Sequence, residues 1–391
     1  MRVLHIGKFF PPHPGGIERS CADLAAALAE RDVDVAVLAH AAPGTRRSSA
    51  RFVERVRVTL AGCHGQLLYA PLSPAFPRLL AREIRDFKPD LLHLHVPNTS
   101  AFWALASPAA RRLPWIVHWH SDIPLDSGHR LLRLAYRAYR PWEQALLRRA
   151  RAVIATSQPY VDASAALAAW HDKVRVVPLG IAPVAAGLPA QASPLWPAGG
   201  LRVLAVGRLS YYKGFDVLLR ALAAVPQAQL LLIGSGECET ALCALARELG
   251  IGERVRFTGH VDDAVLAQAY AQADVLCLPS SERAEAFGLV LLEAMRARLP
   301  VIASDIRGSG VGYVVRDGES GRLVPPRDHA ALATALREFA ADGELRRQLG
   351  ANGYRRWLEE FTLAASAERV AQMYREVLRA SRPRATAASG T

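Results

Sequence analysis

The run Leu201–Gly207, with the sequence LRVLAVG, decides the fold class, because it restarts near mid-chain a pattern that begins at Arg2–Gly7. Each run is a short apolar segment that is followed by a loop and then by a helical period. Repeated strand and helix segments are typical of βαβ units, in which helices cover both faces of a mostly parallel sheet. Since the whole pattern occurs twice, we predict an α/β protein with two Rossmann-like, doubly wound domains facing across a cleft.

The predicted elements follow this alternation along the chain. We expect strands in the first half at residues 2–7, 33–38, 52–60, 90–96, 115–119, 153–157 and 174–179, with a helix at 17–30. We expect strands in the second half at residues 201–207, 229–234, 255–258, 275–279 and 300–304. Residues 183–200 contain four prolines and no regular period, which predicts a linker between domains at 1–182 and 201–361. The tail at 328–380 is predicted to be helical, with breaks at Gly343 and Gly350.

Composition limits the class of protein. With 391 residues, 51% hydrophobic and 21% charged, the chain can build two full cores and is globular rather than disordered. No apolar run approaches the ~18 residues that a membrane-spanning helix needs, and the N-terminus lacks the features of a signal peptide. The five cysteines form no CxxC pair, and their odd number argues against a disulfide framework. We therefore expect a cytoplasmic protein.

The formal charge of +12 is concentrated in residues 1–150, which hold 21 basic and 12 acidic residues. Such a balance suits nucleic acid, anionic lipid or phosphorylated substrates. No nucleic-acid-binding motif accompanies it, so we expect no nucleic-acid partner. Four arginines recur at helical spacing, at Arg130, Arg133, Arg137 and Arg140. They fit a peripheral helix docked on the anionic inner face of the plasma membrane, and equally a solvated helix face.

Two loops that follow predicted strands carry phosphate-binding chemistry. Gly15 and Gly16 directly precede a helix, where backbone amides can approach a phosphate closely, although a plain turn would have the same composition. The dinucleotide fingerprint GxGxxG is absent there, which excludes a Rossmann dehydrogenase. In the second half, Arg208 and Lys213 flank the loop after the first strand. Two cations at this point would neutralise a diphosphate leaving group as its bond to a sugar breaks, while the alternative is a solvated basic loop.

His118 and His120 lie two residues apart on a predicted strand and therefore point to the same side. His120 is at the carboxyl end of the strand, where it could hydrogen-bond a substrate hydroxyl or be an ordinary polar residue. We expect His118 to be structural and to lie deeper in the sheet. A metal site needs a further ligand, and none is evident from the spacing, so we predict no metal.

The segment Ser281–Met295 places two carboxylates, Glu285 and Glu293, eight residues apart around a predicted helix at 287–297. Glu285 is expected to project from the loop at the start of the helix, and Glu293 about two turns inside it. Because a lone buried charge is costly, an acid inside this mostly apolar helix requires a partner. Carboxylates for sugar hydroxyls beside amides for phosphate match the chemistry of a nucleotide-sugar. Turns at Gly234 and Val261, both after strands, could line a nucleoside pocket.

Together these motifs resemble the GT-B glycosyltransferases of family 4, a retaining group that uses nucleotide-activated sugars. The resemblance covers nearly the whole chain. Its most specific part is the EX7E element from Glu285 to Glu293, supported by Gly207-Arg208 with Lys213-Gly214 and by the Gly15-Gly16 pair. One departure is Arg298, which stands where the family usually carries glycine, and the loop at 307–312 is less regular than usual.

The resemblance implies roles that spacing does not show. Glu285 would contact the transferred sugar beside the backbone of Phe287, Gly288 and Leu289, and Glu293 would hold the ribose hydroxyls. Arg208 and Lys213 would bind the diphosphate in place of a metal, and His120 would lie near the sugar. The donor-binding set is then Gly15, Gly16, Arg208, Lys213, Gly234, Val261, Glu285, Phe287, Gly288, Leu289 and Glu293. A final helix at 362–380 would pack back on the N-terminal domain.

The expected activity is transfer of a mannose-type or glucose-type hexose, with retention of configuration, from a nucleotide diphosphate sugar such as GDP-mannose or a UDP-hexose. No cofactor is expected, and the acceptor would be a glycan or lipid-linked sugar in the synthesis of cell-surface polysaccharide or lipopolysaccharide. The alternatives are a nucleotide-sugar 2-epimerase or phosphorylase-like enzyme on the same fold, or a non-catalytic sugar-nucleotide binder. A binder would be expected to lack Glu285, Arg208 or Lys213, and all three are present.

Overall fold

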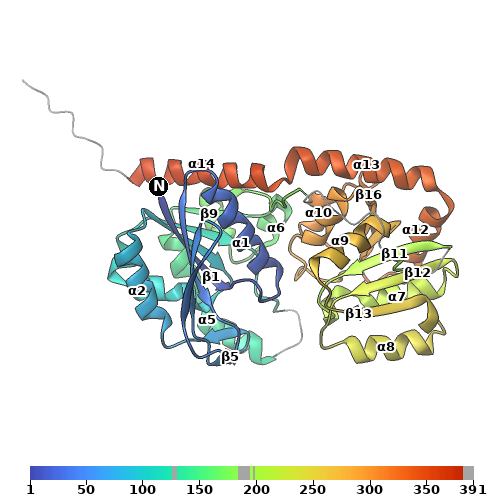
Figure 1. Cartoon of the computed structure of the whole chain (residues 1–391), viewed down its shortest axis with the longest axis horizontal. Coiled ribbons are helices and arrows are strands. Elements are labelled where there is room, and N and C mark those ends of the chain that lie inside the picture. The colour runs from blue at the N-terminus through green and yellow to red at the C-terminus, as the bar shows by residue number, and fades with distance from the viewer. Residues whose placement is uncertain (126–129, 184–193, 197–198, 382–391) are drawn as a thin grey trace, which may run out of the picture. The chain divides into compact units, whose positions relative to one another are not determined.

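The computed structural model describes residues 1–125, 130–183, 194–196 and 199–381, and divides into two compact units, each built on its own sheet (Figure 1). Unit 1 comprises Met1–Thr156, Ser164–Gly180 and the chain from Leu363. Unit 2 comprises Ile181–Thr362 together with the short segment Ser157–Ala163. Most of the predicted linker, at residues 184–193 and 197–198, lies outside the described residues. Within the described part of the chain, no helix has the length and apolar character to cross a bilayer.

The sheet of unit 1 has eight strands and is parallel except at one edge. In sheet order the strands are β10 (Val174–Val176), β9 (Ala152–Ala155), β8 (Trp115–Trp119), β7 (Leu91–Val96), β1 (Arg2–Phe9), β2 (Asp34–His40), β4 (Val56–Ala61) and β3 (Ser49–Val53). The single strand predicted at 52–60 is wrong, because positive φ at Glu54 turns the chain and makes β3 and β4 an antiparallel pair. A separate hairpin joins β5 (Gly65–Leu67) to β6 (Ala70–Leu72).

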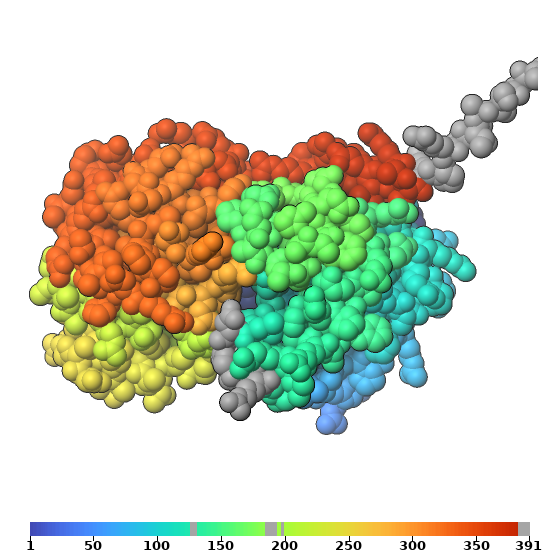
Figure 2. All heavy atoms as spheres, turned by 180° about the vertical axis from the view of Figure 1, so that it is seen from behind, coloured from blue at the N-terminus to red at the C-terminus, as the bar shows by residue number. Residues whose placement is uncertain are grey.

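Helices cover the sheet of unit 1 and complete its core. They are α1 (Gly16–Ala29), α2 (Phe76–Phe87), η1 (Thr99–Phe102), α3 (Trp103–Ala106), α4 (Pro108–Arg111), α5 (Arg130–Arg149), η2 (Ala168–Lys173) and α14 (Leu363–Ser381). The C-terminal helix α14 packs against α1 and buries Val370 and Tyr374 in the same core as Leu28. Figure 2 shows α14, in red, on the surface of this unit.

The sheet of unit 2 has six parallel strands in the order β13 (Val255–Gly259), β12 (Ala228–Ile233), β11 (Leu201–Val206), β14 (Val275–Leu278), β15 (Val301–Ser304) and β16 (Gly321–Val324). The sequence did not indicate β16, whose four residues follow a turn at Gly318. The continuous apolar runs of the inner strands are buried on both faces, as a covered parallel sheet requires. The prediction of an α/β protein with two doubly wound sheets is confirmed.

The helices of unit 2 are α6 (Gln158–Ala163), η3 (Tyr211–Lys213), α7 (Phe215–Ala223), α8 (Glu239–Glu248), η4 (Gly252–Arg254), α9 (Asp263–Gln272), α10 (Leu289–Arg296), α11 (Val311–Val314), α12 (His329–Ala341) and α13 (Gly343–Glu360). The predicted break at Gly343 is confirmed, because Asp342 caps α13 there through Leu345 N–H. The predicted break at Gly350 is wrong. Gly350 lies inside α13, where its missing side chain allows close packing against the carbonyl oxygen of Arg298.

The turn after α10 keeps a shape that usually requires glycine, although it carries Arg298. Arg298 adopts a left-handed φ of 57°, which is uncommon for a residue with a side chain. Its guanidinium carbon lies 3.8 Å from the centroid of the Tyr354 ring on α13, a cation–π contact that offsets part of the cost. The turn therefore keeps its shape with Arg298 in the place of a glycine.

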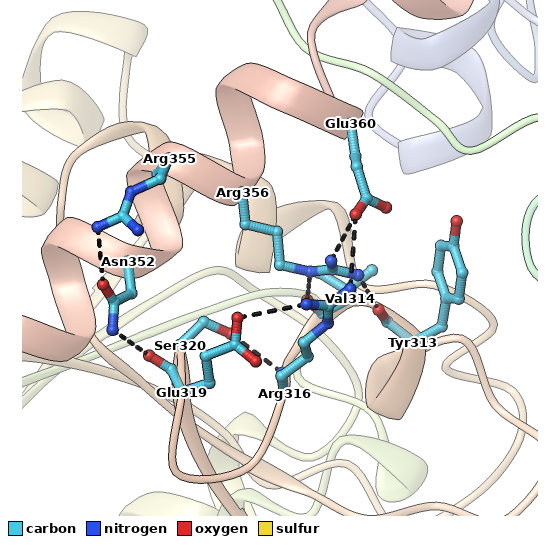
Figure 3. A network of polar contacts seen from close by, with 9 residues as sticks. All are labelled: Tyr313, Val314, Arg316, Glu319, Ser320, Asn352, Arg355, Arg356 and Glu360. Carbon is cyan, nitrogen blue, oxygen red and sulfur yellow. Dashed lines mark hydrogen bonds and ion pairs between the residues drawn. The ribbon is translucent and has the colours of Figure 1, made fainter.

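Arg356 fixes α13 to the last two residues of α11 (Figure 3). Its guanidinium group donates to the carbonyl oxygens of Val314 (3.0 Å) and Tyr313 (2.7 Å), and it pairs with Glu360 at 2.6 Å. Arg356 is buried, so these partners compensate for the loss of hydration. A second contact, from the Asn352 amide to the carbonyl oxygen of Glu319 at 3.0 Å, ties α13 to the turn between α11 and β16.

Candidate active site

The strand order of unit 2 reverses between β11 and β14, and the loops after these two strands carry Lys213 and Glu285. In open α/β sheets, ligands bind at the carboxyl ends of strands where the order reverses, because the loops on either side separate there. The two residues therefore lie at the expected ligand-binding position of this sheet. The sequence placed each of them after a strand, but it could not show that β11 and β14 are neighbours.

Lys213 and Glu285 form a buried ion pair. Their Nζ and Oε2 atoms are 2.6 Å apart, and their side chains are only 11% and 9% exposed. The hydroxyl of Ser280 donates to the same carboxylate oxygen at 2.7 Å. Burial by itself would lower the pKa of Lys213, but the adjacent Glu285 carboxylate reverses the direction and raises it. Lys213 thus remains a cation in a site with little water, where a charge acts strongly on a bound anion.

Backbone contacts hold the loop that carries Glu285. The N–H of Glu285 donates to the carbonyl oxygen of Glu282 at 3.0 Å, and the Ser309 hydroxyl donates to the carbonyl oxygen of Glu285. Gly310 N–H donates to the carbonyl of Ala286 at 2.8 Å, which ties the loop to the chain after β15. Both hydrogen bonds to the Glu285 carboxylate use Oε2. Among the described residues, Oε1 has no hydrogen-bond partner and can accept one from a ligand.

The helix α10 begins two residues later than predicted, at Leu289. Gly288 adopts a left-handed φ of 80°, and a Cβ on it would lie 2.8 Å from the Leu291 side chain, so a larger residue would be strained at this position. Phe287 is buried before the turn, while Leu289 is half-buried after it. Glu293 accepts a hydrogen bond from the Tyr270 hydroxyl at 2.6 Å, which provides the partner that the sequence required of this acid.

Arg208 differs from Lys213 in its surroundings. Its side chain is 62% exposed and reaches Glu237 at 3.4 Å, a surface ion pair of little energetic weight. The sequence treated both cations alike because they flank one loop. The structure buries one against Glu285 and leaves the other free to swing toward a ligand.

Gly234 has structural reasons to be glycine. A Cβ on it would lie 1.9 Å from the carbonyl oxygen of Gly207, and its N–H donates to the carbonyl of Gly259 at 2.9 Å. Its amide is therefore already engaged. Val261 is half-buried in the loop between β13 and α9, and both positions follow carboxyl ends of strands on the Lys213 side of the sheet.

In unit 1, the Gly15-Gly16 pair follows β1 and starts α1, as predicted. The carboxylate of Glu18 folds back onto it, and a Cβ on Gly15 would lie 2.0 Å from Glu18 Oε2. Burial raises the pKa of this carboxyl group. A phosphate that approaches the first amides of α1 would have to displace the Glu18 side chain.

His120 follows β8 directly and is buried, with 5% of its surface exposed. His118 lies deeper in β8 at 2% exposure, as predicted. The sequence analysis missed three further buried histidines beside them: His5, His93 and His95. The alternating LLHLHV of β7 was the available signal, but only the strand order shows that these rings meet. Two triads, His5-His93-His95 and His95-His118-His120, have ring nitrogens within 4.8 Å of one another, close enough to consider a metal ion.

Helix α5 presents an exposed surface that is both basic and apolar. Arg133, Arg137 and Arg140 are exposed, whereas the side chain of Arg130 lies outside the described residues. Leu131, Leu134 and Trp142 are also exposed, by 62%, 61% and 53%. The β5–β6 hairpin adds Leu67, Leu68, Tyr69 and Leu72, and both elements contact η1.

Comparison with known proteins decides the family. A model described as glycosyl transferase 4-like domain matches residues 15–180, and one described as glycosyl transferases group 1 matches residues 190–356. The phosphatidyl-myo-inositol mannosyltransferase of Mycobacterium leprae is 33% identical over 361 residues, which cover 90% of this chain and 91% of that protein. The chain belongs to glycosyltransferase family 4.

Other similarities agree with this assignment. The O-antigen chain mannosyltransferase C of Escherichia coli is 29% identical over 385 residues, covering 97% of this glycosyltransferase and 99% of that protein. The solved structure of sucrose-phosphate synthase from Thermosynechococcus elongatus matches with a TM-score of 0.79 at 28% identity, covering 97% and 100% of the two chains. The two sheets are thus those of a GT-B glycosyltransferase. The enzyme class is hexosyltransferase, and the epimerase and non-catalytic alternatives are not supported.

Proposed function

We propose that this glycosyltransferase moves a hexose of the mannose or glucose type from a nucleotide diphosphate sugar to a glycan or lipid-linked acceptor. The observation that carries the proposal is the buried Lys213–Glu285 pair at the point where the strand order of unit 2 reverses. The two named relatives above are mannosyltransferases, one acting in O-antigen chains and one on phosphatidyl-myo-inositol. These names support mannose as the first sugar to test and cell-surface glycan or lipopolysaccharide synthesis as the setting.

In the proposed complex, Lys213 and Arg208 face the diphosphate, whose negative charge grows as the bond from the sugar carbon to phosphate oxygen breaks. Lys213 is already fixed by Glu285, while the exposed Arg208 leaves Glu237 to reach the phosphate. Glu285 contacts a sugar hydroxyl through Oε1. Glu293, held by Tyr270, accepts from the ribose hydroxyls, and Gly234 and Val261 lie against the nucleoside.

The acceptor oxygen bonds to the same face of the sugar carbon that the phosphate leaves, so the configuration is retained. The acceptor proton passes to an oxygen of the departing diphosphate, which makes a separate protein base unnecessary. Two cationic side chains supply the charge that a metal ion would supply in other transferases, and no metal is required in this proposal. We assign His120, in unit 1, to a hydrogen bond with a hydroxyl group of the sugar.

The matched variants Glu285→Gln and Glu282→Gln test this site. Glu282 lies in the same loop but pairs with the exposed Arg327 at 2.9 Å. We expect Glu285→Gln to lower kcat for hexose transfer by roughly a hundredfold or more, because the charge that fixes Lys213 is lost. Glu282→Gln should keep nearly full activity. Turnover is measured with GDP-mannose and UDP-glucose, and melting curves confirm that both variants are folded.

Equal turnover by the two variants would contradict the assignment of Glu285. Lys213→Gln provides a second check, since it removes the positive charge of the pair while keeping a polar side chain, one atom shorter than lysine. We expect it to be as inactive as Glu285→Gln, whereas Arg208→Gln should weaken binding of the diphosphate.

We also propose that α5 docks unit 1 on an anionic membrane surface, which places the enzyme on the inner face of the plasma membrane. The support is the combination of exposed Leu131, Leu134 and Trp142 with exposed arginines on the same helix. Apolar side chains can enter the lipid boundary while arginines contact headgroup phosphates. The exposed β5–β6 hairpin extends the apolar area.

Sedimentation with vesicles tests the docking. Binding to phosphatidylglycerol vesicles should exceed binding to neutral phosphatidylcholine vesicles and should fall as salt rises. The variant with Arg130, Arg133, Arg137 and Arg140 replaced by Gln should lose most of the binding. The single variant Arg148→Gln, at the other end of α5, serves as the control and should keep it. Binding that does not depend on salt, or no binding, would contradict the proposal.

A further inference from the structure

A row of five buried histidine rings crosses the sheet of unit 1 and ends at His120. His5 lies on β1, His93 and His95 on β7, His118 on β8, and His120 directly after β8. The parallel register places His5 opposite His93 and His95 opposite His118. The ring planes of His118 and His120 are 10° apart and those of His95 and His120 are 14° apart, whereas His5 is tilted by 40° to His93 and by 31° to His95.

Tyr374, from the C-terminal helix α14, joins these rings into one continuous chain of hydrogen bonds. From His120 the chain runs through His95 (Nε2 to Nδ1, 2.9 Å), His5 (Nε2 to Nδ1, 3.0 Å), the Tyr374 hydroxyl (3.2 Å from His5 Nε2), His93 Nδ1 and His118 (Nε2 to Nδ1, 3.2 Å). We call these six side chains the histidine ladder. Each inner ring uses both of its nitrogens in the chain, whereas His120 and His118 use only one. The nitrogens left over at the two ends of the ladder are His120 Nδ1 and His118 Nε2.

The number of protons on the ladder is fixed by burial. Loss of hydration lowers the pKa of His5 and His120 to about 3 and holds the pKa of the other three rings well below its usual value. Each neutral ring then carries one N–H proton, and Tyr374 contributes one more. Six protons serve five hydrogen bonds, so all bonds point the same way and one proton is left at one end.

The surroundings of the two ends decide which end carries the remaining proton. His118 Nε2 is buried and has no hydrogen-bond partner among the described residues. A proton there would make a buried N–H donor without an acceptor, which is rarer in proteins than an unpaired acceptor. The lone pair therefore lies at His118 Nε2. Every ring then donates from Nδ1 toward His120, and the last proton is on Nδ1 of His120.

We propose that the histidine ladder holds His120 in the tautomer with its proton on Nδ1, so that His120 meets the substrate only as a hydrogen-bond donor to a hydroxyl or phosphate oxygen. That His120 meets a donor substrate rests on the proposed function, whereas the tautomer does not. His95 acts directly, through its hydrogen bond to His120. His5, Tyr374, His93 and His118 act through it, and all five are positioning residues.

The same nitrogens could instead hold a metal ion, since two triads of them lie within 4.8 Å. A tetrahedral metal needs lone pairs that converge on one point. In each triad, two rings already share a hydrogen bond, His5 with His95 and His95 with His120. The third ring uses its nitrogens outside its triad, because His93 bonds to Tyr374 and His118, and His118 bonds to His93. The geometry favours the hydrogen-bonded ladder, and a bound metal is a result that would overturn it.

Long-range proton–nitrogen correlation spectra of the full-length protein, labelled with nitrogen-15 in histidine, test the tautomer directly. All five ladder rings should show Nδ1–H with an unprotonated Nε2. The opposite direction of the ladder would give Nε2–H in all five. Finding the Nε2–H form, charged rings, or a transition metal in elemental analysis of the purified protein would overturn the proposal. This experiment needs no substrate, so its result on the tautomer stands even where the proposed function is wrong.

The variants His95→Leu and His95→Gln test the positioning role. Leucine removes the donor to His120 Nε2, whereas the glutamine amide can still donate. We expect His95→Leu to lower kcat for transfer roughly tenfold, the effect of one lost hydrogen bond, and His95→Gln to recover most of it. Nucleotide affinity, measured by calorimetry, should not change in either variant. Equal kcat in both variants and the wild type would overturn the positioning role.

Discussion

Gly350 shows at the scale of a residue how packing can require glycine inside a helix. A Cβ at this position would lie 2.1 Å from the carbonyl oxygen of Arg298, which is backbone and cannot rotate away. Alanine would favour the helix by about 0.5–1 kcal/mol, but relief of the clash costs about 1–3 kcal/mol. We therefore expect Gly350→Ala to reduce the free energy of unfolding of unit 2, measured by urea denaturation.

Gly343→Ala is the matched control, because it lies at the start of the same helix. Its Cβ would come no closer than 3.5 Å to a flexible arginine side chain, so its stability should match or slightly exceed that of the wild type. If Gly350→Ala proved as stable as Gly343→Ala, the close packing of α13 on the Arg298 turn would be wrong.

At the scale of the element, the strands β1, β7 and β8 bring together five histidines that remain uncharged when buried. An unfolded chain protonates such rings below pH about 6.5, while the fold keeps the pKa of His5 and His120 near 3. Protons then bind the unfolded state preferentially, so the stability present above pH 6.5 is lost as the pH falls. Each ring contributes a slope of up to about 1.4 kcal/mol per pH unit.

We expect the melting temperature of unit 1 to fall steeply between pH 6.5 and 5, measured by calorimetry. Glu143 and Glu18 oppose this trend, because burial raises the pKa of both carboxyl groups, that of Glu143 to about 7, but they are two groups against five rings. A melting temperature that stays constant over this range would contradict the prediction that the five rings are neutral.

At the scale of the whole molecule, the predicted nucleotide contacts are unevenly divided between the units. Arg208, Lys213, Glu285 and Glu293 all belong to unit 2. A ligand that binds only the folded state stabilises it by about 2.7 kcal/mol at a concentration of 100 times its Kd. We therefore expect one class among GDP-, UDP-, ADP- and dTDP-sugars to raise the melting transition of unit 2, followed by calorimetry.

Glu293→Gln should diminish that shift, because the amide is a weaker acceptor for ribose hydroxyls than the carboxylate. If no nucleotide class raises the melting transition, this result would argue against the donor pocket in unit 2. It would leave the family assignment and the fold unchanged.

The sequence by itself determined the fold class and the chemical types of the site residues. Alternating apolar strands and helices are local patterns, and positions directly after strands identified Lys213, Glu285 and His120 as candidates. Local patterns failed where a neighbour distant in the chain decides the outcome. Gly350 lies inside α13 and is glycine because of its close packing on the Arg298 turn, not because the helix breaks there, and β16 is too short to have a recognisable period.

Only the tertiary structure decided which of these residues meet. The adjacency of β11 and β14 buries Lys213 against Glu285, whereas Arg208, five residues away, stays on the surface. The registers of β1, β7 and β8 with α14 assemble the histidine ladder from four elements that span nearly the whole chain. Strand order and register are set by the packing of the complete sheet, and no local stretch of sequence contains that information.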